Sequence, residues 1–337
     1  MLLRSAALAL ALLLAGCGEP PLAGQGKPTF DREALTEKLQ TVATRVGPAR
    51  LGVAVQDLTT GQVFSFNGDQ RFPMQSVFKA PLGAAVLAEV EAGRLKLDQE
   101  ITIKDVDLSP TYSPVADLWP GRDTYTVNEL LDRSTGGSDN TAADVLMKQV
   151  GGPGAVTAWL QGRKVLGVRV DRYERQLQPE ILGMPSFRAE WREPAAYIHA
   201  LQAVPEDARR QAVQAYLTDP RDTATPLGAV RFLEALNQGE LLSPASTQRL
   251  LTIMTQTQTG QGRLYAARPD GASLAHKTGT ARTDLGMNPA TNDIGIFTLK
   301  NGHRFAVAVF LSGSALDDVG RDEVIAEVGR IVMKAAK

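Results

Sequence analysis

Segments typical of β-strands lie at both ends of this chain, and the stretch between them is predominantly helical. Near the N-terminus, "RLGVAVQDLTTGQVFSFN" predicts two strands joined by a turn at 59–61. Near the C-terminus, "SLAHKTGTA", "NDIGIFTLK" and "RFAVAVFLS" predict three more strands. Apolar residues at helical spacing predict an amphipathic helix before the first strand and another after the last one. A sheet must therefore be assembled from both ends, which predicts an α+β fold with an antiparallel sheet flanked by terminal helices.

An all-helical domain is expected between the two halves of this sheet. The α/β domain would comprise 30–67 and 256–337, and the helical domain 68–255. Composition and apolar spacing predict helices at about 77–92, 127–134, 141–150 and 226–237.

The first 16 residues (1–16) have the pattern of a secretory signal peptide. One positive charge at Arg4 precedes an Ala/Leu run that is too short to span a bilayer comfortably. Leu14-Ala15-Gly16-Cys17 resembles the lipobox of bacterial lipoproteins, in which the cysteine becomes the lipidated first residue. The Pro/Gly-rich stretch 17–29 would then be a flexible tether. We expect an exported, periplasm-side lipoprotein anchored to a membrane through Cys17; the alternative is a plain secretory signal with an incidental cysteine.

Composition argues against several other function classes. The chain has 337 residues and a net charge of −1, which gives no reason to expect a nucleic-acid partner. Its three histidines and one cysteine provide no zinc-ligand spacing, so neither a metal nor another cofactor is expected. We expect a monomer.

The stretch "FPMQSVFKAPL" holds Ser76 and, three residues later, Lys79. Residues three apart share one face of a helix, so the amine would lie one turn behind the hydroxyl and could accept its proton. On its own, however, the pair is better explained by a serine that caps a helix and a lysine on the helix surface.

Two further triplets change this interpretation. Ser138-Asp139-Asn140 precedes a predicted helix and by itself would be explained by capping. Lys277-Thr278-Gly279 ends a predicted strand and by itself would be explained by a strand that stops at glycine. Together and in this order, SxxK, SDN and KTG form the motif set of serine β-lactamases and penicillin-binding proteins. Ser76 is therefore predicted to be a nucleophile.

With these motifs the chain resembles the class A serine β-lactamases from about residue 30 to its C-terminus. "RYERQLQ" places Arg172 and Glu174 at the spacing of the family's omega loop, and "TYSPV" matches the family's aromatic gate at Tyr112. "FPMQSVFK", "TQTGQGRL" with Arg263, "HKTGT" and "TNDIG" resemble the extended-spectrum branch. The resemblance implies the fold shared by serine β-lactamases and penicillin-binding proteins, and a small-molecule β-lactam substrate.

The resemblance also implies a role for each matched residue. Ser76 would attack the lactam carbonyl, and the backbone N–H groups of Ser76 and Thr280 would form the oxyanion hole. Lys79 and Glu174 would share the work of the base, and Glu174 would activate the water that hydrolyses the acyl-enzyme. Ser138, beside Lys277, would relay a proton to the leaving nitrogen. The residues implied to bind the substrate are Tyr112, Asn140, Gln178, Arg263, Lys277, Thr278 and Gly279.

The chain departs from the family's pattern in its omega loop. Gln178 stands where the family usually has an asparagine that helps to hold the deacylating water, and glutamine adds a methylene. The family closes this loop with an arginine–aspartate ion pair, but here the aspartate is Asp222, 50 residues after Arg172. The excess, 179–218, contains two helix-like stretches that start with proline, which predicts a helical hairpin inserted in the loop. The insertion is either a tolerated surface addition or a lid that widens or covers the pocket.

Hydrolysis of penicillins and cephalosporins through a serine acyl-enzyme is the leading interpretation. A penicillin-binding protein or D,D-peptidase is one alternative, against which Glu174 argues because such proteins generally lack this glutamate. A β-lactam-binding sensor is another, if Gln178 and the insertion make deacylation slow.

Overall fold

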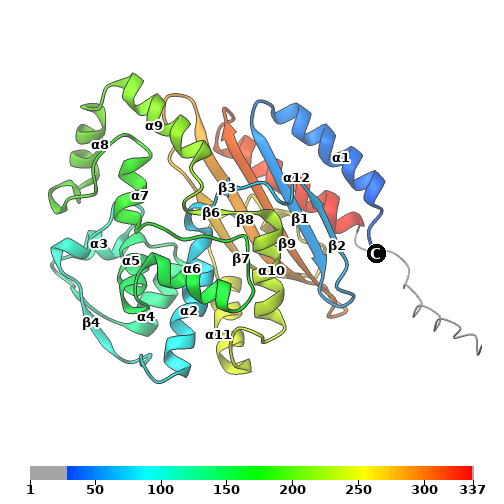
Figure 1. Ribbon diagram of the computed structural model, residues 1–337, viewed down its shortest axis with the longest axis horizontal. Helices are drawn as coiled ribbons and strands as arrows, with labels where there is room; N and C mark the ends of the chain where they lie inside the picture. The colour runs from blue at the N-terminus through cyan, green and yellow to red at the C-terminus, as the bar shows by residue number, and fades with distance from the viewer. Residues whose placement is uncertain (1–28, 336–337) are drawn as a thin grey trace, which may run out of the picture.

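The computed structural model describes residues 29–335 and is built around a five-stranded antiparallel sheet (Figure 1). The strand order is β2-β1-β9-β8-β7. The bounds are β1 Arg50–Asp57, β2 Val63–Phe66, β7 Ser273–Thr280, β8 Asn288–Thr298 and β9 Arg304–Ser314. The two ends of the chain meet where β1 pairs with β9 along its full length. The predicted α+β fold is confirmed.

Each face of the sheet has its own hydrophobic core. Along β9, Val307, Val309 and Leu311 belong to one core, whereas Ala308 and Phe310 belong to the other. Successive side chains of a strand point to opposite faces, so a strand that is apolar throughout must be covered on both sides. The first core is closed by α1 (Arg32–Val46) and α12 (Asp318–Ala335), so both terminal helices cover the same face (Figure 1).

Helices from the middle of the chain cover the other face. Their bounds are α2 Lys79–Glu91, α3 Pro114–Leu118, α4 Val127–Leu131, α5 Asn140–Gln149, α6 Pro153–Gly162, α7 Glu174–Glu180, α8 Pro194–Gln202, α9 Glu206–Thr218, α10 Pro226–Asn237 and α11 Pro244–Thr255. Two short strand pairs accompany them, β3 (Phe72–Pro73) with β6 (Thr223–Ala224) and β4 (Glu100–Thr102) with β5 (Thr124–Thr126). Short 3₁₀ and π turns complete the chain, at Gln75–Phe78, Asp105–Asp107, Asp132–Gly136, Ala189–Trp191 and Leu264–Ala267.

Helix α2 lies at the centre of this layer. Every residue from Lys79 to Leu87 is buried, so this part of α2 is enclosed on all sides instead of showing one polar face to solvent. Its N-terminal end packs against the sheet, because the 3₁₀ turn that precedes it contacts β7 and β8. Ser76 and Lys79 are thereby placed at the junction of the helical layer and the sheet.

The two helices predicted within 179–218 are present as α8 and α9, but they do not pack along each other as the helices of a hairpin would. In Figure 1, α8 lies at the outer end of the helical layer and α9 runs back toward the sheet, where it contacts β3 and β8. Phe187 packs on Trp191 and Tyr197, with ring centroids 6.4 and 5.9 Å apart. These aromatic rings are part of the same hydrophobic core as α2 and α5.

The predicted signal peptide, Cys17 and most of the predicted tether lie outside the described residues. Within residues 29–335, no helix has the length and apolarity needed to cross a membrane. The same part of the chain has no cluster of three or more His, Cys, Asp or Glu side chains that could hold a metal ion.

Candidate active site

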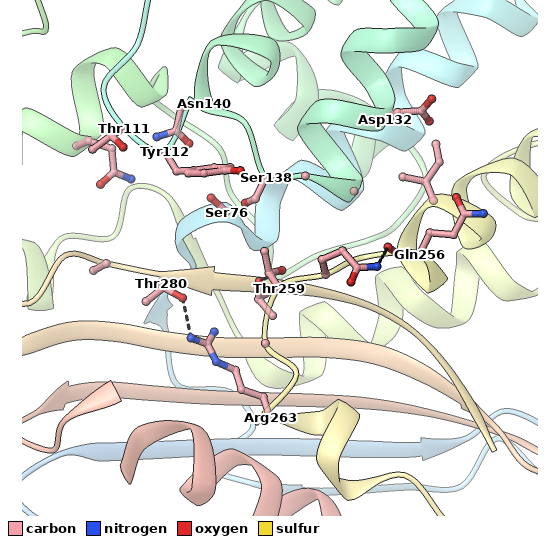
Figure 2. A pocket seen from close by; sticks show the side chains of 18 of the residues that line it. Ser76, Thr111, Tyr112, Asp132, Ser138, Asn140, Gln256, Thr259, Arg263 and Thr280 are labelled. Atoms are coloured by element: carbon pink, nitrogen blue, oxygen red, sulfur yellow. Dashed lines mark hydrogen bonds between the residues drawn. The ribbon is translucent and has the colours of Figure 1, made fainter. Parts of the chain in front are cut away.

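Most of the residues expected at the site line a cleft of about 920 Å³. Figure 2 shows Ser76, Tyr112, Ser138 and Asn140 on one side and Thr280 on strand β7 on the other, with Arg263 behind it. The expected site residues in the lining are Ser76, Tyr112, Ser138, Asn140, Gln178, Arg263, Thr278 and Thr280. Lys79, Glu174 and Lys277 have no exposed surface and lie behind this lining.

Ser76 lies inside the 3₁₀ turn Gln75–Phe78, which leads directly into α2. The residues that cap these two helical segments are Met74 and Phe78, and neither accepts a side-chain capping bond. The interpretation of Ser76 as a helix cap is therefore wrong. Its hydroxyl instead donates to Oε1 of Glu174, 3.4 Å away, and its side chain remains partly exposed to the cleft.

Lys79 forms a buried ion pair with Glu174. Its Nζ lies 3.1 Å from Glu174 Oε1, and both side chains are fully buried. The same nitrogen donates to the carbonyl oxygen of Ser138 at 2.8 Å and to Oδ1 of Asn140 at 2.6 Å. An ammonium group has three N–H donors, so these three acceptors satisfy it completely. A buried charge requires such full pairing to be tolerated.

The residues of the Ser138-Asp139-Asn140 triplet have different roles. Asp139 does cap α5, because its carboxylate accepts from the backbone N–H of Ala142 at 2.9 Å. Ser138 does not cap; it adopts a φ of 61°, which is rare for a residue other than glycine. Strain of this kind costs on the order of 1–3 kcal/mol and is concentrated at functional sites. The bond from Lys79 to its carbonyl helps to hold this conformation.

Strand β7 forms the opposite wall and approaches the nucleophile closely. The strand does not stop at Gly279, which pairs with Asn292 of β8, but continues to Thr280. A Cβ at position 279 would overlap the carbonyl oxygen of Met74 and stand 3.1 Å from the backbone nitrogen of Val77. Glycine is therefore needed here so that β7 can lie against the turn that carries Ser76.

Lys277 projects from β7 to the other side of Ser138. Its Nζ donates to Ser138 Oγ at 3.0 Å and to the carbonyl oxygen of Thr278 at 3.0 Å. Burial, and then the positive charge of Lys79, holds the pKa of Lys277 well below its ordinary value. An amine tuned in this way releases its proton readily, which suits a group that supplies protons through a hydroxyl.

Arg263 supports the β7 wall from behind. Its Nη2 donates to Thr280 Oγ1 at 2.9 Å, and its Nε is paired with Asp322 at 2.6 Å. The hydroxyl of Thr278 is joined to that of Thr259 at 2.7 Å. The hydroxyls of Thr278 and Thr280 therefore face the cleft with fixed partners, and the guanidinium lies next to them.

Gln178 reaches the carboxylate of Glu174 despite its extra methylene. Its Nε2 donates to Glu174 Oε2 at 2.7 Å and to Oε1 of Gln75 at 2.8 Å. The longer side chain thus connects the omega loop to the residue immediately before the nucleophile.

Arg172 joins the two ends of the omega loop, and we call this point the neck of the loop. Its Nε lies 2.6 Å from Asp222, so the ion pair expected from the sequence forms across 50 residues. Its Nη1 also approaches Glu180 at 3.1 Å and Asp219 at 3.4 Å, which stand at the two ends of the insertion. The insertion therefore leaves and rejoins the loop at one charged cluster.

Several residues around the site carried no signal in the sequence. Gln75 and Tyr216 are joined by a 2.6 Å hydrogen bond across 141 positions. Asp144 accepts from the backbone N–H groups of Glu174 and Arg175 at 2.7 and 2.9 Å. Burial, and then the charge of Glu174, raises the pKa of Asp144 to about 7. Arg282 lines the cleft, and no hydrogen bond or ion pair joins it to another residue among those described.

This arrangement defines a class of enzyme. A partly exposed serine lies beside a buried lysine–carboxylate pair, and a second lysine reaches it through another serine hydroxyl. Such a site can form and resolve a serine ester, which is the chemistry of a serine acyl-transfer hydrolase.

Comparison with known proteins gives the family. The family described as "Beta-lactamase enzyme family" matches residues 34–336. Beta-lactamase VEB-1 of Pseudomonas aeruginosa is 30% identical over 300 residues, covering 88% of this chain and 88% of that protein. The extended-spectrum beta-lactamase PER-1 of the same species is 31% identical over 284 residues, covering 84% and 81%.

Solved structures agree with this assignment. The class A beta-lactamase described as the last common ancestor of Gram-negative bacteria is 39% identical, with a TM-score of 0.73, over 90% of this chain and 99% of that one. A beta-lactamase from Chitinophaga pinensis is 32% identical, with a TM-score of 0.74, over 90% and 99%. The chain belongs to the beta-lactamase family and is a class A serine β-lactamase, which hydrolyses β-lactams. The alternatives of a penicillin-binding protein and a sensor are not favoured.

Proposed function

We propose that β-lactams acylate Ser76 and that Glu174 releases the enzyme by activating a water molecule. The observation that carries the proposal is at the bottom of the cleft. Ser76 Oγ and Lys79 Nζ meet the same oxygen, Glu174 Oε1, at 3.4 and 3.1 Å. The nucleophile and a base thus lie within reach of each other, as general-base catalysis requires.

In acylation, Ser76 Oγ bonds to the lactam carbonyl carbon while its proton passes to the Lys79–Glu174 pair. Either member of the pair can take this proton, because Ser76 Oγ and Lys79 Nζ meet the same carboxylate oxygen, so acylation does not depend on Glu174 alone. The backbone N–H groups of Ser76 and Thr280 hold the oxyanion. The C–N bond then breaks, and the nitrogen takes the proton of Ser138, which Lys277 replaces across their 3.0 Å contact.

Before deacylation, the Lys79–Glu174 pair gives up the proton taken from Ser76 and Lys277 regains the proton it supplied, both by exchange with solvent. In deacylation, Glu174 removes a proton from a water molecule that attacks the ester carbon. The ester bond breaks, and the proton returns to Ser76 Oγ. Gln178 supports this step because its amide fixes the second oxygen of Glu174 at 2.7 Å. The amide lies in the cleft lining, where it can contact the acyl group.

The substrates proposed are penicillins and cephalosporins. Their carboxylate would meet the hydroxyls of Thr278 and Thr280, with Lys277 beside Thr278 as a hydrogen-bond donor and Arg263 providing positive charge nearby. Asn140 would contact the side-chain amide of the substrate, and Tyr112, which is 61% exposed, would flank the entrance. The relative PER-1 is named an extended-spectrum enzyme, which supports cephalosporins as substrates.

We also propose that the enzyme is an exported lipoprotein anchored through Cys17 and works as a monomer on the periplasm side. The lipobox-like Leu14-Ala15-Gly16-Cys17 supports the anchor, and a site built from a single chain supports the monomer. Mass spectrometry of the mature protein should find an acylated N-terminal Cys17; a free N-terminus at another residue would refute the anchor.

The catalytic assignment is tested with the protein lacking residues 1–16 and a chromogenic cephalosporin. We expect multiple turnovers that Ser76→Ala abolishes. Glu174→Ala should still be acylated but should deacylate about 100- to 10,000-fold more slowly, since a general base contributes that much. The adduct should then be visible as a mass increase. A single stoichiometric burst from the wild type would instead indicate a penicillin-binding protein or a sensor, and rapid turnover by Glu174→Ala would exclude its role as the base.

A further inference from the structure

The insertion is connected to the catalytic carboxylate by an unbroken line of hydrogen bonds, which begins in the buried interior and ends at the cleft. Tyr216, on helix α9 of the insertion, accepts a hydrogen bond from Gln75 Nε2 at 2.6 Å. Gln75 Oε1 accepts from Gln178 Nε2 at 2.8 Å, and the same Nε2 donates to Glu174 Oε2 at 2.7 Å. Tyr216 and Gln75 are buried, with 3% and 0% of their surface exposed.

The orientation of each amide in this line is fixed by chemistry. An ionised carboxylate can only accept, so Gln178 must direct its NH₂ group at Glu174. The second hydrogen of that NH₂ group then requires an oxygen, which is Oε1 of Gln75. The NH₂ group of Gln75 consequently faces Tyr216, whose hydroxyl oxygen is the acceptor. Each member can therefore hold only one orientation while the next one is in place.

Helix α9 is itself held firmly enough to act as a support. Val213 and Tyr216 are buried on its inner side. Arg209 is paired with Asp284 of the β7–β8 turn at 2.6 Å, and both side chains are nearly buried. The guanidinium of Arg172, at the neck of the omega loop, lies 6.0 Å from the centre of the Tyr216 ring.

The insertion does not reach the substrate directly. The residues that line the cleft include Gln178, which precedes the insertion, and none from 179–218. Any effect of the insertion on catalysis must therefore pass through other residues, and the Tyr216–Gln75–Gln178 line leads to the carboxylate that deacylation needs.

We propose that the insertion is a positioning element for deacylation: Tyr216 orients the Gln75–Gln178 amide pair, which holds Glu174 against the acyl-enzyme. The inference rests on the role proposed above for Glu174. Tyr216 and Gln75 are positioning residues, since neither lines the cleft. Their effect should fall on the step that uses Glu174 as a base and much less on acylation.

The test is Tyr216→Phe, which removes only the hydroxyl, with Tyr197→Phe as the matched control. Tyr197 is a buried tyrosine on helix α8 of the same insertion, and it is not part of the hydrogen-bonded line to Glu174. For Tyr216→Phe we expect the acyl-enzyme to persist on the order of tenfold longer, the effect of losing one hydrogen bond. With deacylation limiting, kcat and KM should fall together and kcat/KM should stay within about twofold. Tyr197→Phe should match the wild type.

A structural defect alone would give a different result. A smaller active fraction lowers kcat and leaves both KM and the lifetime of the acyl-enzyme unchanged. Gln75→Leu serves as the second variant, because it removes both of the Gln75 hydrogen bonds. It should lengthen the acyl-enzyme lifetime, and adding Tyr216→Phe to it should change little, since the line is already broken.

The outcomes separate this inference from the assignment of Glu174. If Glu174→Ala deacylates at the wild-type rate, the assignment itself fails. If Glu174→Ala retains the adduct but Tyr216→Phe releases it at the wild-type rate, only the positioning role fails.

Discussion

The close approach of β7 to the nucleophile predicts that Gly279→Ala impairs acylation specifically. The added Cβ would overlap the carbonyl oxygen of Met74, two residues before Ser76. Contacts of a real Cβ begin at 3.0 Å, so relieving the overlap requires β7 and the segment that carries Met74 to separate by roughly 0.7 Å. A shift of about 1 Å in an active site can reduce the rate a hundredfold. Because the backbone N–H groups of Ser76 and Thr280 would move apart, we expect kcat/KM to fall about 30- to 100-fold.

The assay is kcat/KM for a chromogenic cephalosporin, with the active fraction counted from the acylation burst. Overpacking should also lower the free energy of unfolding by about 1–3 kcal/mol, which a urea titration would measure. Gly154→Ala on α6 is the control, since a Cβ there meets nothing within 4 Å and activity should be unchanged. A Gly279→Ala enzyme with kcat/KM within about threefold of the wild type would refute the argument, because β7 could then move without disturbing the site.

Two further predictions concern charge around the site. The buried Asp144 has a pKa raised to about 7, whereas an unfolded chain would titrate it near 4, so the folded state holds the proton more tightly. The stabilisation from this carboxyl group is therefore complete below about pH 4 and is lost as the pH rises through 7. The Tm of Asp144→Asn should consequently fall less than the Tm of the wild type over that range. A difference in Tm between Asp144→Asn and the wild type that does not vary from pH 4 to 8 would contradict this. Arg282 lines the cleft with no hydrogen bond or ion pair to another described residue, so its charge is free to attract an acidic substrate. Arg282→Glu should raise KM several-fold for cephalosporins with an acidic side chain, because the substrate would lose about 1 kcal/mol of binding free energy. The KM for neutral cephalosporins should change much less. Equal KM changes for both substrate types would exclude a charge effect.

The sequence predicted those parts of the site whose residues lie close together in the chain. Ser76 and Lys79 are three residues apart at the start of a helix, so their proximity follows from helix geometry alone. The triplet at Lys277 needed only a strand to bring it to one wall. The antiparallel sheet was likewise predictable, because its strands are apolar runs bounded by turns.

Contacts between distant segments could not be predicted in this way. The hydrogen bond between Gln75 and Tyr216 depends on how a long insertion folds back, and neither residue belongs to a motif. Asp144 sits in a stretch with ordinary helical composition, and its environment changes only when the omega loop packs on α5 and directs two N–H groups at its carboxylate. Arg263 was expected to meet the substrate, but its pairing with Asp322 is visible only in three dimensions.

The sequence allowed two descriptions of the insertion, a tolerated surface addition or a lid that widens or covers the pocket, and the packing of its residues bears on both. Its apolar residues, among them Met184, Phe187, Leu201 and Tyr216, belong to the same core as α2 and α5, so they are not a separate surface feature. It also lines no part of the cleft, as a lid would. Closing a longer loop costs little extra entropy, about 0.6 kcal/mol for each doubling of its length. What a long insertion must preserve is the position of the two loop ends, where Arg172 pairs with Asp222. Arg172 meets that requirement by holding Asp222 together with Glu180 and Asp219, which bracket the insertion, and the short helix that carries Glu174 therefore stays against α5.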